Sequence, residues 1–260
     1  MDHLGISGVI ILGVAAFLAG GINAVAGGGS LITFPSLIAF GFAPVTANVT
    51  NTVALVPGYI GGIAGYRREL EGQSKTIRTL LPAVFAGAVI GSVILLTTSA
   101  DIFRILVPVL VLAAALLLLF QPMIQKRMTA THPETGEPIS GKPSRYTIAS
   151  VFLSAIYGAY FGGVLGIVLL AVLGISLIDS LQRLNALKSV LQFSINIVAV
   201  IIFALFGPVQ WWVVAFMSPL TLAGGWLGSH FARGLNPLVL RRVIGIYGIC
   251  CAIALAVFLR

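Results

Sequence analysis

The chain has 260 residues, of which 58% are hydrophobic and only 8% are charged, and its formal net charge is +8. Because a soluble domain carries about 25% charged residues, this composition excludes a soluble protein and predicts that nearly all of the chain lies in lipid. The basic residues fall in short loops between apolar stretches, which is the pattern of a membrane protein with basic cytoplasmic loops. Nucleic-acid binding is therefore a poor explanation of the positive charge.

The first apolar stretch, residues 4–26, has no basic region before it, so we expect a membrane segment rather than a removable signal. Near its end, Asn23 precedes the run Gly27-Gly28-Gly29-Ser30. Glycines in a helix interior cost about 1 kcal/mol each relative to alanine. We therefore predict that the helix breaks here and restarts at Ser30, where unpaired backbone N–H groups favour an anion. The alternative is that these glycines only let helices pack closely.

Ten apolar stretches follow one another, and several reach the length of about 20 residues that spans a bilayer as a helix. They run approximately over 4–26, 31–45, 48–66, 79–98, 102–121, 147–162, 164–178, 184–206, 209–230 and 237–259. Two of them, 31–45 and 164–178, are short and follow glycines, the second after Gly162-Gly163. Such a pair, at matching positions of two halves, indicates the binding site of a transporter. The Pro- and Gly-containing segment 122–146 is predicted to be a flexible cytoplasmic linker.

The two halves of the chain repeat one another. Six residues recur 137 positions later, namely Pro82, Ala86, Gly87, Gly91, Ser92 and Arg104 as Pro219, Ala223, Gly224, Gly228, Ser229 and Arg241. Three recur 134 positions later, namely Gly28, Gly29 and Asn51 as Gly162, Gly163 and Asn185. The preserved spacing predicts a duplicated unit, with repeats at 1–121 and 147–260. The Gly87/Gly91 and Gly224/Gly228 pairs have the spacing of helix-packing motifs.

Loop charges predict that the repeats are inverted. Eleven of the fifteen basic residues lie in three loops, near 66–78, 122–146 and 231–242, which we place in the cytoplasm. The loops equivalent to the first and the third are 206–209, which has no charge, and 98–103, which carries only Asp101. The chain is therefore predicted to be an all-α integral membrane protein of two inverted repeats of about five segments each. About eight segments would span fully, two would be short and glycine-broken or re-entrant, and both termini would lie outside.

Polar side chains within apolar segments supply further candidates. They include Thr50, Asn51, Asn185, Lys188 and Gln192. Such residues are expensive in lipid and face the interior of a bundle, where amides either bind an oxyanion or hold helices together. Lys188, whose counterpart is Ala54, is either an anion partner or proton-coupling group, or it extends its ammonium to the cytoplasmic surface.

The sequence lacks the features of an enzyme. No acid pair lies within a predicted span, no His/Cys/Asp cluster has metal-ligand spacing, and no nucleotide-binding motif occurs. We therefore expect no catalytic residue, no metal and no cofactor. Asp179 and Arg183 are expected to form an interfacial ion pair, and the adjacent Cys250 and Cys251 to be packing residues. A passive channel for small anions or solutes and a membrane scaffold protein are the alternatives to a carrier.

The chain resembles the TauE/SafE sulfite exporter family, also called TSUP, over essentially its whole length. The resemblance is carried by GGINAVAGGGSLITFP from Gly20 to Pro35, ANVTNT from Ala47 to Thr52, Pro57-Gly58 and Gly65-Tyr66-Arg67. The second half is similar to the family's weaker repeat, in which glycine pairs replace the GGGS run. The resemblance implies a secondary transporter of the bacterial inner membrane that exports small sulfur-containing anions such as sulfite, sulfoacetate or related sulfonates.

Together, the residues and the resemblance predict one anion site shared between the halves. It would comprise Asn23, Gly27, Gly28, Gly29, Ser30, Thr50, Asn51, Asn185, Lys188 and Gln192. The glycines and Ser30 would donate from the backbone, the asparagines would orient the anion, and Lys188 would balance its charge. The expected partners are a small sulfur-containing anion as substrate and the lipid bilayer, with no nucleic acid. Coupling to a proton or a sodium ion and assembly into a homo-oligomer are both compatible with this hypothesis.

Overall fold

The computed structural model describes residues 5–25, 28–65, 67–131, 143–177, 179–231 and 237–258, and within these ranges the chain is helical without strands. The helices are α1 (Ile6–Val25), α2 (Ser30–Ala39), α3 (Pro44–Gly65), α4 (Ser74–Thr97), α5 (Ala100–Thr131), α6 (Arg145–Tyr160), α7 (Leu165–Ser176), α8 (Leu181–Phe206), α9 (Trp211–Phe231) and α10 (Pro237–Phe258). The predicted all-α class is confirmed.

Five of the helices in the described ranges are long and apolar enough to cross a membrane. These spans are Ile6–Asn23, Ser74–Thr97, Ala100–Met123, Gln182–Phe206 and Arg241–Phe258. Large apolar side chains such as Ile105, Leu205 and Val257 are exposed on their outer faces, as lipid-facing residues are. The chain is therefore a membrane protein. By comparison, α6 has 16 residues, fewer than the roughly 20 that a perpendicular span requires.

The two short elements occur where the glycine runs predict them. α2 has 10 residues and α7 has 12, and both are apolar. α2 packs against α1 and α3, its neighbours in the chain, and α7 packs in the same way against α6 and α8. α2 also contacts α10, and α7 contacts α5. Each short helix is thus held inside the bundle by helices of both halves.

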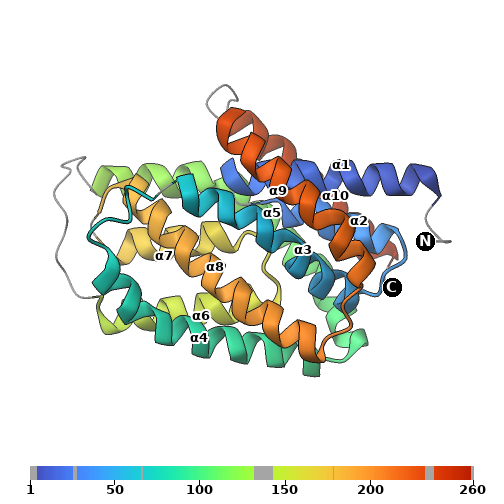
Figure 1. Cartoon of the computed structure of the whole chain (residues 1–260), viewed down its shortest axis with the longest axis horizontal. Coiled ribbons are helices and arrows are strands. Elements are labelled where there is room, and N and C mark those ends of the chain that lie inside the picture. Colours follow the sequence, from blue (N-terminus) through green and yellow to red (C-terminus); the bar gives the residue numbers. More distant parts are fainter. Residues whose placement is uncertain are drawn as a thin grey trace.

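The halves are interleaved rather than side by side. Figure 1 shows α4 and α6 paired along the lower edge and α1 along the upper edge, where it packs on α9. The predicted glycine pairs lie at these contacts. A Cβ atom at Gly91 would overlap the carbonyl of Ile156 in α6, and one at Gly224 would overlap the carbonyl of Phe17 in α1. The prediction that these glycines allow close helix packing is confirmed.

The segment predicted as a linker, 122–146, is partly helical. α5 continues to Thr131, ten residues beyond the predicted end of the apolar stretch at Gln121, and α6 begins at Arg145. The physical reason is that Gln, Met, Ile, Lys and Arg are good or tolerable helix formers, so the helix does not end where its apolar character does. Residues 132–142 lie outside the described residues.

Candidate functional site

The two chain breaks lie beside each other in the middle of the molecule. Gly28 precedes α2, and Val164 precedes α7. A Cβ atom at Gly28 would lie 3.8 Å from Cγ1 of Val164. One turn away, the rings of Phe34 and Phe161 meet edge to face with centroids 5.5 Å apart. Segments that are 134 residues apart in the chain therefore meet at one place.

The first break is closed by a side chain. Oδ1 of Asn23, in the last turn of α1, accepts a 2.8 Å hydrogen bond from the backbone N–H of Gly29. Nδ2 of the same amide is buried and has no hydrogen-bond partner among the described residues. The structure thus brings Asn23, Gly28 and Gly29 together and places Ser30 at the start of α2, but the N–H of Gly29 is already bonded within the protein. Gly27 lies outside the described residues.

The second break contains a strained residue that the sequence does not reveal. Val164 has φ 50° and ψ 24°, in the left-handed region, and Gly162 before it has φ 74°. A β-branched residue pays about 1–3 kcal/mol for this conformation, and such strain is concentrated at binding and switch regions. The hydroxyl of Tyr157 donates a 2.7 Å hydrogen bond to the carbonyl of Gly163 and holds the break in place.

The polar face of α8 lies against the start of α7. A Cβ atom at Gly166 would lie 2.8 Å from Oε1 of Gln192 and 3.7 Å from Cδ of Lys188. Nζ of Lys188 donates to Oδ1 of Asn185 over 3.3 Å, and the side chain of Gln192 hydrogen-bonds Tyr59 of α3. Three residues predicted for the site, Asn185, Lys188 and Gln192, therefore gather one turn beyond the second break.

The two α3 candidates have different surroundings. Asn51 is only 2% exposed, and its Oδ1 has no hydrogen-bond partner among the described residues. One turn earlier, Asn48 donates through Nδ2 to the carbonyl of Tyr160 over 2.9 Å, at the end of α6 and next to the second break. Thr50, by contrast, accepts a 3.0 Å hydrogen bond from the backbone N–H of Gln210. Asn51 thus lies buried one turn along α3 from Asn48, whereas Thr50 secures the loop between α8 and α9.

Two further polar residues near the site are missed by sequence reasoning. Gln121 in α5 is 5% exposed, and its Oε1 is buried without a hydrogen-bond partner among the described residues. Nε of Arg241 in α10 is also buried. The sequence did carry a signal for Gln121, because it continues the buried face of Ala114 and Leu118 at spacings of seven and three.

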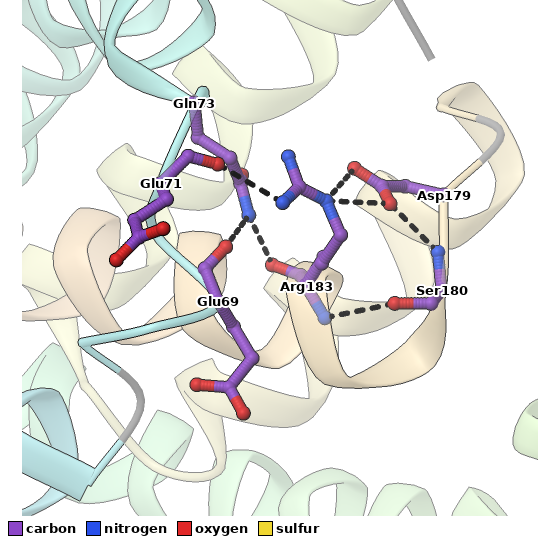
Figure 2. A network of polar contacts seen from close by, with 6 residues as sticks. All are labelled: Glu69, Glu71, Gln73, Asp179, Ser180 and Arg183. Carbon is purple, nitrogen blue, oxygen red and sulfur yellow. Dashed lines mark hydrogen bonds and ion pairs between the residues drawn. The ribbon is translucent and has the colours of Figure 1, made fainter. Parts of the chain in front are cut away.

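A polar network joins the halves beyond this site (Figure 2). Nε of Arg183 lies 2.9 Å from Oδ1 of Asp179, so the predicted ion pair is confirmed. Nη1 of Arg183 donates to the carbonyl of Glu71 over 3.0 Å, and Nε2 of Gln73 donates to the carbonyl of Arg183 over 2.9 Å. The loop between α3 and α4 is thereby tied to the first turn of α8, five residues before Lys188.

The central region contains buried polar atoms of both kinds beside a positive charge. Buried polar atoms without partners cost about 1–3 kcal/mol each unless water or a ligand satisfies them. Nδ2 of Asn23 is such a donor, which an anion would satisfy, whereas Oδ1 of Asn51 and Oε1 of Gln121 are acceptors, which require a donor. Lys188 supplies positive charge beside them. Within the described residues, no group of three His, Cys, Asp or Glu side chains is placed to hold a metal. A separate groove of about 660 Å³ between α1, α2 and α10 is lined mainly by apolar side chains and contains none of the predicted site residues.

These features define a class of protein: a helical membrane protein in which two chain breaks meet beside buried polar side chains. The profile of the family described as sulfite exporter TauE/SafE matches residues 12–255, and the chain belongs to that family. The resemblance noted in the sequence is thus confirmed.

Curated relatives carry the same general description. A probable membrane transporter protein of Haemophilus influenzae is 26% identical over 248 residues, covering 93% of this chain and 91% of the relative. The probable membrane transporter protein ORF9 of Sinorhizobium sp. is 27% identical over 261 residues, covering 98% and 95%. The probable membrane transporter protein YfcA of Escherichia coli K12 is 25% identical over 240 residues, covering 90% and 86%. No solved structure matches the chain.

Proposed function

We propose that the protein is a secondary transporter that exports small sulfur-containing anions, such as sulfite or organosulfonates, across the bacterial inner membrane. The observation that carries the proposal is the meeting of the two breaks, at Gly28 and Val164, beside the buried polar face of α8. Discontinuous segments that meet inside a membrane bundle are the usual substrate sites of secondary transporters. The sulfur-containing substrate is supported by membership of the TauE/SafE family.

In this proposal, Lys188 neutralises the anion, and the amides of Asn23, Asn51, Asn185 and Gln192 orient it. Nδ2 of Asn23 is a buried donor without a partner among the described residues, which a substrate oxygen would satisfy. The backbone N–H groups of Gly28 and Ser30 supply further donors at the start of α2. Thr50 acts indirectly, by fixing the loop that starts at the end of α8.

Alternating access would come from movement of one inverted repeat against the other. Helix pairing supports the duplication, since α1 packs on α9 as α6 packs on α4, and α2 packs on α10 as α7 packs on α5. Exchanging the halves therefore reproduces the pairing. The opposite charges of equivalent loops support the same arrangement, in which the two short helices enter the site from opposite sides.

Counterflow in proteoliposomes tests the proposal. Vesicles that contain the purified protein are loaded with unlabelled sulfite and diluted into radiolabelled sulfite. A carrier accumulates label transiently, because the outward movement of unlabelled substrate returns empty sites to the outer face. A passive channel gives only equilibration, and a scaffold protein gives uptake equal to that of empty vesicles. Either of these two results would contradict the proposed function.

A further inference from the structure

The two breaks are closed by side chains at equivalent positions of the repeat. In the first half, Asn23 is hydrogen-bonded to Gly29, six residues later, and in the second half Tyr157 is hydrogen-bonded to Gly163, also six residues later. Each residue of the second pair lies 134 positions after its counterpart in the first, which is the offset of the repeat at the breaks. A bond from the last turn of a helix to the break that follows is therefore common to both halves.

The two bonds have opposite polarity. Asn23 accepts from the backbone N–H of Gly29, whereas the hydroxyl of Tyr157 donates to the backbone carbonyl of Gly163. Gly29 has φ −59° and ψ −33°, the ordinary right-handed conformation. Val164, which follows Gly163, has φ 50° and ψ 24°. The second bond, unlike the first, therefore lies beside a strained residue.

The bond from Tyr157 acts on the backbone of Val164. The carbonyl of Gly163 and the N–H of Val164 belong to one rigid peptide plane. Rotation of this plane changes φ of Val164 directly, and about half a turn brings φ to the negative values that a β-branched residue adopts without strain. The 2.7 Å hydrogen bond from Tyr157 holds the carbonyl and opposes this rotation. Tyr157 thereby maintains the left-handed conformation of Val164.

The conformation of Val164 sets the direction in which α7 leaves the break, because Val164 immediately precedes the first residue of that helix. Two residues later, Gly166 lies against the polar face of α8. Oε1 of Gln192 and Cδ of Lys188 are 2.8 and 3.7 Å from the position that a Cβ atom would take at Gly166. A small shift of α7 would therefore change its contact with both side chains.

The end of α6 provides a fixed reference for this arrangement. Nδ2 of Asn48 in α3 donates to the carbonyl of Tyr160, the last residue of α6, over 2.9 Å. The ring of Tyr160 packs edge to face on that of Phe103 in α5, with centroids 5.8 Å apart. Tyr157 lies one turn before Tyr160, so its hydroxyl is carried by a helix end that contacts α3 and α5 of the first half.

We propose that Tyr157 is a positioning residue of the anion site. Its hydrogen bond to Gly163 keeps Val164 left-handed, and this conformation holds the start of α7 against Lys188. Without the bond, rotation of the peptide plane releases the strain at Val164 and moves α7 relative to α8. Tyr157 thus acts through the backbone of the break rather than on the substrate. This inference rests on the proposed function, because the site that Tyr157 positions is the proposed site of transport.

Sulfite transport in proteoliposomes and sulfite binding to the purified full-length protein test this inference. Tyr157→Phe removes the hydroxyl and keeps the ring. We expect it to lower transport about tenfold, because the peptide plane is then free to rotate. The matched control is Tyr146→Phe, which removes a hydroxyl from an exposed tyrosine at the other end of α6 and should change transport less than about twofold.

Val164→Gly distinguishes positioning from a merely structural hydrogen bond. Glycine adopts the left-handed conformation without strain, so the peptide plane gains nothing by rotating. Val164→Gly alone should transport within about threefold of the wild type, and adding Tyr157→Phe to it should cost less than about twofold. A merely structural bond predicts the same loss from Tyr157→Phe in both backgrounds, because the carbonyl of Gly163 loses its donor in each.

The outcomes separate the role of Tyr157 from the proposed function. Equal losses in the two backgrounds, or wild-type transport by Tyr157→Phe, would overturn the role of Tyr157 while the wild type still transports sulfite. A folded Val164→Gly protein that does not transport would overturn it as well, since the valine side chain itself would then be required.

Thermal unfolding covers a folding defect in Tyr157→Phe. If this variant unfolds, restoration of the folded protein by Val164→Gly supports the proposal, and a failure to restore it overturns the proposal. If the wild-type protein neither binds nor exchanges sulfite, the proposed function is wrong and the inference falls with it.

Discussion

The side-chain oxygen of Asn23 accepts a hydrogen bond from the backbone N–H of Gly29, six residues later, and so closes the first helix break. The bond joins the last turn of α1 to the residue before α2. It also fixes the amide so that Nδ2 stays buried without a partner among the described residues. One side chain therefore both stabilises the break and keeps a buried donor, which the proposed substrate would satisfy.

Two substitutions separate these roles of Asn23. Asn23→Leu leaves the N–H of Gly29 unsatisfied and should lower the free energy of unfolding by about 1–3 kcal/mol. Asn23→Asp keeps the acceptor for the N–H of Gly29 but replaces the Nδ2 donor by a carboxylate oxygen, so it should weaken anion binding about tenfold or more. Thermal unfolding and anion titration of the two variants provide the measurements. Unchanged stability in Asn23→Leu would show that the hydrogen bond does not hold the break.

The contact between Gly28 and Val164 predicts graded effects of side-chain size. A Cβ atom at Gly28 meets only the flexible end of Leu118, at 3.2 Å, so Gly28→Ala should retain most transport. Gly28→Val adds two methyl groups between Leu118 and Val164 and should cost about 1–3 kcal/mol through overpacking. Transport and membrane insertion should be measured together. We expect Gly28→Val to insert but to transport poorly, and full transport would argue against a functional junction here.

The hydrogen bonds of Arg183 predict that a cross-link between the two halves at this place stops alternating access. Nη1 of Arg183 reaches the carbonyl of Glu71 across the two halves (Figure 2). In a background with Cys250→Ala and Cys251→Ala, Glu71→Cys and Arg183→Cys should be joined by a short bifunctional thiol reagent. We expect the cross-linked protein to bind anion and to lose transport, while each single-cysteine variant treated with the reagent remains active. Undiminished transport after complete cross-linking would show that these loops do not separate during the cycle.

The inverted topology predicts which exposed loop positions share a side of the membrane. Single cysteines at Lys75 and Arg242, in the background without Cys250 and Cys251, should be labelled by an impermeant maleimide only after the cells are opened. A cysteine at Ser99, in the loop between α4 and α5, should be labelled in intact cells. Labelling of Arg242→Cys and Ser99→Cys from the same side would contradict the inversion, because the equivalent loops 231–242 and 98–103 would then lie on one side of the membrane.

The features that sequence predicts well depend on local physics. Glycine runs weaken a helix wherever they occur, so the short helices α2 and α7 could be predicted near their true positions. The ion pair of Asp179 and Arg183 follows from their spacing of four residues across the start of α8. The glycine pair at Gly87 and Gly91 likewise gives the packing of α4 on α6.

The features that sequence does not predict depend on distant packing. Thr50 accepts a hydrogen bond from the backbone N–H of Gln210, 160 residues away. Nothing in the sequence around Thr50 distinguishes its role from that of Asn51. In the sequence, Arg241 is one of several basic residues near a loop. In the structure, α10 packs against α5 and the Nε of Arg241 is buried. Val164 adopts a conformation that its own side chain disfavours, so only tertiary contacts could impose it.

The central claim, an anion site at the junction of the two breaks, is tested most directly by Lys188. Sulfite transport in proteoliposomes should be compared for the wild type, Lys188→Ala and the control Lys75→Ala, whose lysine is exposed. We expect Lys188→Ala to reduce transport by about 10- to 100-fold with little change in thermal unfolding, while Lys75→Ala stays within about twofold. Wild-type transport in a folded Lys188→Ala protein would contradict the central claim.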